Sequence, residues 1–235
     1  MSMLVLAIDT CGAAGSVALA RIGEAGAGDG SVAEILGQEE LAAKTYSATL
    51  IGAIETLLEK AQCRVSDLRC IVAVSGPGSF TGVRVGLSTV KGLAEPGGTP
   101  VVTVSRLEVL AKKAGVGSAA LDAHRNEVFL RLGSNGQGNE ARELLAGRAE
   151  LTAIAAPPAS IAVCDDAAAA LLTSVWPGVH CVCVSAPTAS DAAQVAAQRV
   201  IEGQFADLAL LDGHYLRRSD AEIFGEKAAA RATGK

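Results

Sequence analysis

Ser75-Gly76-Pro77-Gly78-Ser79-Phe80-Thr81-Gly82 joins a short apolar segment to an amphipathic one, and this junction decides the fold. The preceding residues 70–74 are apolar and rich in β-branched side chains, which predicts a buried parallel strand. The residues that follow repeat apolar side chains at helical spacing, so we expect a helix with Thr81 as its N-cap. The stretch is therefore a glycine-rich turn that leads from a strand into a helix.

This turn has two interpretations. Its backbone N–H groups lie at the positive end of a helix dipole and suit a bound phosphate. Its glycines equally suit tight packing against another backbone. It is not a Walker loop, because the lysine and the hydroxyl residue that close that motif are missing. The sequence leaves both interpretations open.

A strand, an aspartate, a turn and a second strand occur twice, about half a chain apart. The first copy contains Asp9 between apolar residues 4–8 and 16–20, and the second contains Asp122 between residues 118–121 and 127–131. The repeat predicts a duplicated βββαβαβα architecture with right-handed parallel crossovers. Further strands are expected at 32–36, 100–104, 160–163 and 179–184, and further helices at 45–61, 165–174, 190–202 and from Ser105, with Glu108 completing a capping box.

Five segments, in order along the chain, carry a family resemblance: residues 4–10, 73–93, 104–110, 121–128 and 215–222. Together they resemble the TsaB (YeaZ) family, the accessory proteins of the bacterial machinery that makes threonylcarbamoyladenosine on tRNA. The resemblance implies an α/β fold of the actin/Hsp70/sugar-kinase type, which is ribonuclease H-like. We expect lobes at residues 1–104 and 105–220, followed by a flexible tail at 221–235.

Composition restricts the classes of function. Half of the 235 residues are hydrophobic and only 3% are aromatic, which predicts a core of small aliphatic side chains. The net charge of −5 argues against a broad basic face for nucleic acid. No apolar run is long enough for a membrane span, and the N-terminus lacks a basic leader region. We expect a cytoplasmic protein whose six cysteines are reduced, and we do not expect His180, Cys181 and Cys183 to bind zinc.

A nucleotide cleft is the first candidate site. Asp9 and Asp122 are expected at the ends of equivalent strands, facing one cleft, where such aspartates orient Mg²⁺ around nucleotide phosphates. The turns after them retain few glycines, so each aspartate has an alternative role as an acceptor of turn N–H groups. The candidate cleft consists of Asp9, Thr10, Gly76, Gly78, Ser79 and Asp122.

A partner interface is the second candidate site. Gly78, Gly82 and Gly86 recur every four residues and permit close backbone approach, either to another chain or within the core. The resemblance implies dimerisation, with the same protein or with the catalytic paralogue TsaD, through the two helices expected at 45–61 and 81–93. The candidate interface is an exposed ridge formed by Tyr46, Leu50, Ile54, Val83, Arg84, Leu87 and Lys91.

The resemblance implies an accessory subunit and not an enzyme. The His-x-x-x-His metal pair of the catalytic paralogue is missing, and Tyr46 stands where the family often has histidine. The implied partners are a TsaD-like transferase and a TsaE-like ATPase, with a homodimer when alone, tRNA contacted only indirectly, and no membrane. No cofactor is expected on the chain alone; ATP or ADP with Mg²⁺ at the partner interface is left open. The alternatives are an autonomous ATP-binding enzyme and a peptidase using Ser75 or Ser79 with His124.

Overall fold

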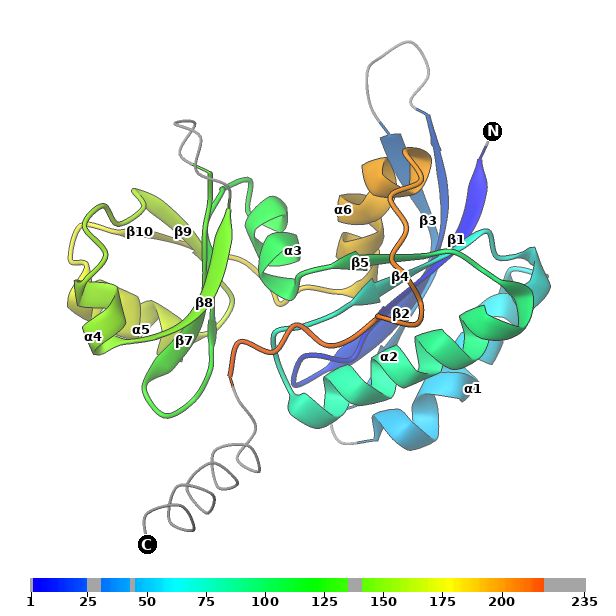
Figure 1. The fold of residues 1–235 in the computed structure, drawn as a ribbon, viewed down its shortest axis with the longest axis horizontal. Coiled ribbons are helices and arrows are strands. Elements are labelled where there is room, and N and C mark those ends of the chain that lie inside the picture. The colour runs from blue at the N-terminus through cyan, green and yellow to red at the C-terminus, as the bar shows by residue number, and fades with distance from the viewer. Residues whose placement is uncertain (1, 25–30, 43–44, 135–140, 218–235) are drawn as a thin grey trace, which may run out of the picture.

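The computed structural model describes residues 2–24, 31–42, 45–134 and 141–217. Two five-stranded mixed sheets, each carrying helices, form two lobes that lie side by side (Figure 1). Among the helices of these described ranges, none has the length and apolar character needed to cross a bilayer. The predicted tail at 221–235 lies outside the described residues.

The first sheet has the strand order β3-β2-β1-β4-β5. Its elements follow the chain as β1 Met3–Asp9, β2 Gly15–Glu24, β3 Ser31–Leu41, α1 Tyr46–Lys60, β4 Cys70–Val74, α2 Phe80–Ala94 and β5 Val101–Val104, with 3₁₀ turns at Val65–Asp67 and Glu95–Gly97. β2 pairs antiparallel with β1 and β3, whereas β4 pairs parallel with β1 and β5. Every residue of β4 is buried, as expected for a strand covered on both faces.

The second sheet, β10-β9-β6-β7-β8, repeats this order. Its elements are β6 Ala119–Asp122, β7 Glu127–Leu132, β8 Arg142–Gly147, α4 Arg148–Thr152, β9 Ser160–Val163, α5 Asp166–Val175 and β10 His180–Cys183. The pairing is again antiparallel across β6, β7 and β8 and parallel across β6, β9 and β10. The duplicated βββαβαβα prediction is therefore confirmed.

The last helix of each copy packs against the sheet of the other copy. α3, Arg106–Lys113, follows β5 and buries Leu107 and Leu110 against β6 and β7. α6, Ala189–Ile201, follows β10 and lies on the first sheet, opposite α1 and α2 (Figure 1). Its buried face consists of small side chains, Ala189, Ala192, Ala193, Ala196, Ala197 and Val200. This exchange joins the two lobes, and the division at residue 104 stays a prediction.

The chain returns to the first lobe after α6. Residues 205–217, here called the C-terminal strap, run along β5 and then cross to the second lobe (orange in Figure 1). Near its start, the Ala206 N–H donates to the carbonyl of Val101 at 2.8 Å. Near its end, the Arg217 guanidinium donates to the carbonyl of Ala123 at 2.7 Å and also pairs with Glu127. The strap is thus fixed to both lobes.

Candidate functional site

The glycine-rich turn packs directly on the β1–β2 turn. The Ser79 N–H donates to the carbonyl of Cys11 at 2.8 Å, and the Thr10 hydroxyl donates to the carbonyl of Gly82 at 2.7 Å. A Cβ on Gly78 would lie 2.1 Å from the Cys11 oxygen, and one on Gly82 would lie 2.0 Å from the Thr10 oxygen. No side chain fits at that separation, so these two positions need glycine for close packing.

These contacts decide one open question and correct one expectation. The four-residue glycine spacing allowed close approach either to another chain or within the core, and Gly78, Gly82 and Gly86 all face residues 10 and 11 of the same chain. The N-cap of α2 is Ser79 and not Thr81, because the Ser79 hydroxyl accepts from the Gly82 N–H at 3.2 Å. Of the two interpretations of the turn, the contacts match tight backbone packing.

Asp9 is buried and engaged by its own chain. One carboxylate oxygen accepts the Cys11 N–H at 2.8 Å, and the other lies 3.4 Å from Nε of Arg106. Arg106 is itself 8% exposed, and its guanidinium lies against the backbone of Gly12. Burial, and then the negative charge of Asp9, raises the pKa of the Cys11 thiol. A buried arginine therefore balances the charge of Asp9 without a metal ion or phosphate.

Asp122 makes the same turn in the second lobe. Its carboxylate accepts the His124 N–H at 2.8 Å and pairs with the imidazole of His124, which is 87% exposed. Its own N–H donates to Asp165, the N-cap of α5, at 3.1 Å. Both aspartates thus hold the N–H two residues further along, which is the turn role left open by the sequence.

Tyr46 of α1 holds the β1–β2 turn through its hydroxyl group. Its hydroxyl donates to the carbonyls of Gly12 at 2.8 Å and Ala13 at 3.1 Å. The ring lies against Gly15, where a Cβ would come within 2.9 Å of it. Tyr46 is 7% exposed, so it stabilises the β1–β2 turn from the core.

The predicted ridge is largely core, so its expected exposure is wrong, whereas a partner interface on these two helices stays a prediction. Five of its seven side chains are buried under α1 and α2, because their helical period faces the sheet: Tyr46, Leu50, Ile54, Val83 and Leu87. Only Arg84, which is exposed, and Lys91, which is half-buried, reach solvent. The solvent face of α1 instead carries Ile51, which is 48% exposed.

A polar cluster at the lobe junction was not predicted. Glu143 on β8 accepts from Ser105 at 2.7 Å, from Arg131 at 2.8 Å and from His214 of the strap at 3.0 Å. Burial opposes ionisation of Glu143, but the hydrogen bonds from His214, Ser105 and Arg131 outweigh it and lower its pKa. The cluster lines a cavity of about 670 Å³ between β5, β8 and the strap. No strand was expected at residues 142–147, so the contact of Glu143 with Ser105, Arg131 and His214 could not be predicted.

The two serines considered as peptidase nucleophiles, Ser75 and Ser79, have structural roles. Ser75 donates to the Val104 carbonyl at 3.4 Å, and Ser79 caps α2. In the cavity cluster, Ser105 donates to Glu143 and not to the imidazole of His214. Within the described ranges no group of three His, Cys, Asp or Glu side chains is arranged to hold a metal ion.

The fold and its two aspartate turns define a duplicated α/β protein of the actin-like, ribonuclease H-like architecture. Residues 36–149 match the family TsaD, tRNA N6-adenosine threonylcarbamoyltransferase. The Bacillus subtilis tRNA threonylcarbamoyladenosine biosynthesis protein TsaB is 35% identical over 134 residues, 55% of each chain. A tRNA N6-adenosine threonylcarbamoyltransferase of Maricaulis maris is 41% identical over 69 residues, 29% of this chain and 18% of that protein.

The solved structure of YeaZ from Pseudomonas aeruginosa superposes with a TM-score of 0.67 at 24% identity, covering 91% of this chain and all of that one. The matched part spans about half the length of the curated TsaB relatives. Over the matched half the chain is similar to the TsaB proteins, and its fold is that of the YeaZ structures.

Proposed function

We propose that this chain is a non-catalytic subunit of the bacterial machinery that forms threonylcarbamoyladenosine at position 37 of tRNA. In this role it docks on a TsaD-like transferase and activates it. The name of the TsaB relatives supports the pathway, and the TsaD match over residues 36–149 supports a paralogous partner.

The observation that carries the proposal is that protein groups already occupy the space around the carboxylate of Asp9. Arg106, the Cys11 N–H and the packed glycine turn use the groups that a nucleotide phosphate and its metal ion would need. A catalytic nucleotide site of the actin-like kind needs free carboxylate oxygens and loop N–H groups. The geometry therefore favours a supporting role over autonomous ATP chemistry.

The uncovered faces of α1 and α2 are the proposed docking surface. The two helices lie next to each other on one face of the first sheet (Figure 1). Ile51 and Gly52 on α1 and Gly92 on α2 are exposed, and a Cβ on either glycine would meet nothing within 4 Å. Small exposed residues allow another helix to approach closely. A paralogue with equivalent helices fits such a surface in a pseudo-twofold arrangement.

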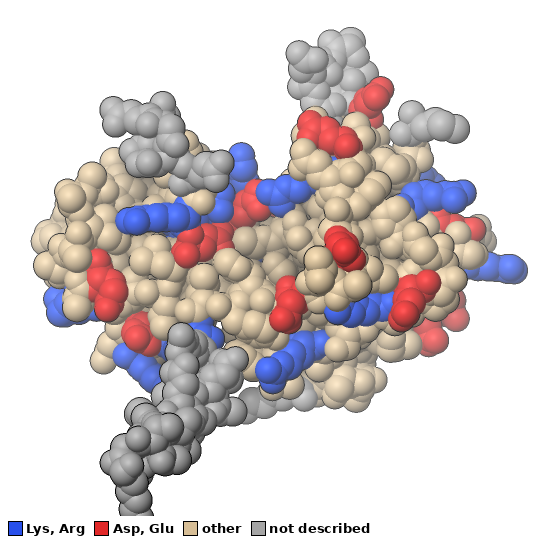
Figure 2. Space-filling model, in the orientation of Figure 1, with Lys and Arg blue, Asp and Glu red and all other residues tan. Residues whose placement is uncertain are grey.

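The charge distribution supports an indirect relation to tRNA. Acidic and basic side chains are interspersed over both lobes on the face shown in Figure 2. The chain as a whole is acidic, with a net charge of −5. Phosphate backbones bind to concentrated lysine and arginine, so we assign the main tRNA contacts to the transferase.

The test is threonylcarbamoyl transfer to tRNA by the cognate TsaD-like enzyme, with the remaining pathway components, with and without this chain. We expect activity to depend on the chain, to survive Asp122→Ala and to fall at least tenfold with Ile51→Glu. The matched control is Val32→Glu, which also places a charge at an exposed apolar position, 55% exposed on β3. Leu50→Glu is unsuitable, because Leu50 is 1% exposed and the charge would disrupt the core. Equal activity without the chain would overturn the proposal and favour the ATP-binding alternative.

A further inference from the structure

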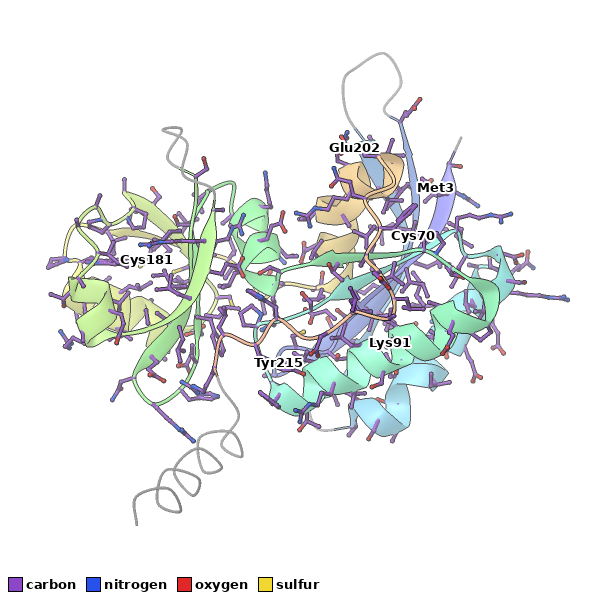
Figure 3. The ribbon with its side chains drawn as sticks, in the orientation of Figure 1. Met3, Cys70, Lys91, Cys181, Glu202 and Tyr215 are labelled. Carbon is purple, nitrogen blue, oxygen red and sulfur yellow. The ribbon has the colours of Figure 1, made fainter. Side chains whose placement is uncertain are left out.

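The strap places an aromatic ring against the N-terminal end of α2. Tyr215 stacks on Phe80 with ring centroids 4.5 Å apart and an interplanar angle of 28°. Figure 3 shows Tyr215 beside this end of the helix, while Lys91 lies further along it. A Cβ on Gly213 would lie 2.5 Å from the Tyr215 ring and 2.7 Å from Val83. The strap thus lies in direct contact with the first turn of α2.

Arg84 lies over these two rings. Its guanidinium carbon is 4.2 Å from the centroid of Phe80, one helical turn away, and 5.8 Å from the centroid of Tyr215. The negative face of an aromatic ring attracts a cation and holds it in one orientation. We call Phe80, Arg84 and Tyr215 the arginine stack.

The arginine stack carries an unbalanced positive charge. Arg84 is exposed, and among the described residues no carboxylate forms an ion pair with it. The first turn of α2 contains no acidic residue, so the positive end of the helix dipole adds to the same charge. An oriented guanidinium with free N–H groups is well suited to a carboxylate, which it can bind in a bidentate manner.

We propose that the arginine stack is the part of the docking surface that selects the TsaD-like partner, by binding an acidic side chain of that partner through Arg84. This inference rests on the proposed function and adds the C-terminal strap to the interface. The stack is continuous with the solvent face of α2, and its half-buried rings exclude water on one side of the guanidinium. An ion pair covered by a docked helix is worth more than a solvated one.

The experiment is a titration of this chain with the cognate TsaD-like protein at two salt concentrations. We expect Arg84→Glu to weaken binding at least tenfold and Arg84→Lys to weaken it severalfold, because lysine cannot form the bidentate pair. Tyr215→Leu keeps the charge but removes the stacked ring, so a severalfold loss is expected. Arg84→Gln should lower the salt dependence of the dissociation constant. The matched control is Arg69→Glu, a charge reversal at an exposed arginine before β4, and thermal melting verifies that each variant is folded.

The outcomes distinguish a failure of the role of Arg84 from a failure of the proposed docking on the transferase. If Ile51→Glu abolishes binding while Arg84→Glu binds like the wild type, the arginine stack has no role and the docking function stands. If the wild-type chain does not bind the transferase, both fail. If Arg84→Glu leaves transferase binding intact but lowers the affinity for tRNA in a filter assay, Arg84 contacts phosphate and the inference is overturned.

Discussion

The same strand, aspartate and turn occur in both lobes, but only the first turn is buried beneath other parts of the chain. Asp9 and Asp122 each accept the N–H two residues further along at 2.8 Å. Around Asp9 a buried arginine and a tightly packed glycine turn take the remaining space. Within the described part of the chain, the carboxylate of Asp122 pairs with the exposed imidazole of His124. The aspartate turn is therefore the common structural unit, and the difference lies in what packs against it.

This comparison explains the glycines of the first lobe. A glycine-rich turn before a helix is commonly associated with phosphate. Here the Cβ positions of Gly78 and Gly82 fall on the carbonyls of Cys11 and Thr10, which a phosphate would have to displace. The spacing thus reflects the packing of α2 on the β1–β2 turn, and α5 in the second lobe begins without a comparable turn.

The largest expected effect is a difference in the free energy of unfolding between variants at the two aspartates. Asp9→Asn should lower the free energy of unfolding by about 3–5 kcal/mol, because it leaves Arg106 buried without its counterion. Asp122→Asn should cost less than about 1 kcal/mol, because its partner His124 is 87% exposed. Urea denaturation of both variants at neutral pH measures the difference.

A double variant controls for the loss of charge. Asp9→Asn combined with Arg106→Met removes both buried charges and should recover part of the lost stability. If Asp9→Asn and Asp122→Asn prove equally mild, the buried pair does not distinguish the turns and the comparison fails.

The next largest effect is a difference in stability between alanine variants at two glycines of α2. Gly82→Ala should destabilise the protein by about 1–3 kcal/mol, because the new Cβ falls on the Thr10 carbonyl. Gly92→Ala should stabilise it by up to about 1 kcal/mol, because a Cβ there meets nothing within 4 Å and alanine favours the helix. Thermal melting gives the sign of each change. Stabilisation by both would mean that α2 does not pack tightly on the first turn.

Most of the fold could be predicted because its elements have strong local patterns. The apolar residues 70–74 form β4 with the predicted bounds, and the helical period from Tyr46 gives α1 within a residue of its ends. β8 was missed because Arg142-Glu-Leu-Leu-Ala-Gly147 does not alternate, and its pairing with β7 is tertiary. The placement of α6 on the first sheet was also not predictable, since alanines carry no information on which sheet they face.

The candidate sites were harder to predict than the fold. Local periodicity shows that Leu50 and Val83 share a face, but not whether that face covers the sheet or meets another chain. The Ser105–Glu108 capping box was wrong, because Glu108 instead pairs with Arg199 of α6 at 2.6 Å. Arg106 could not be assigned to Asp9, since a contact across such a sequence separation depends on the assembled lobes.

The smallest expected effect concerns Glu143, which ties the strap to the second lobe. Its pKa is lowered by hydrogen bonds from His214, Ser105 and Arg131, which outweigh the opposing effect of burial. The ionised carboxylate therefore stabilises the fold above its unfolded pKa of about 4.3, and that stability is lost as the pH falls through the lowered folded value. Glu143→Gln should cost roughly 1 kcal/mol at pH 7, since the amide keeps one acceptor, and the difference should vanish in acid. Denaturation at both pH values, with the exposed Glu55→Gln as control, tests this, and a pH-independent difference would show that charge on Glu143 does not hold the strap.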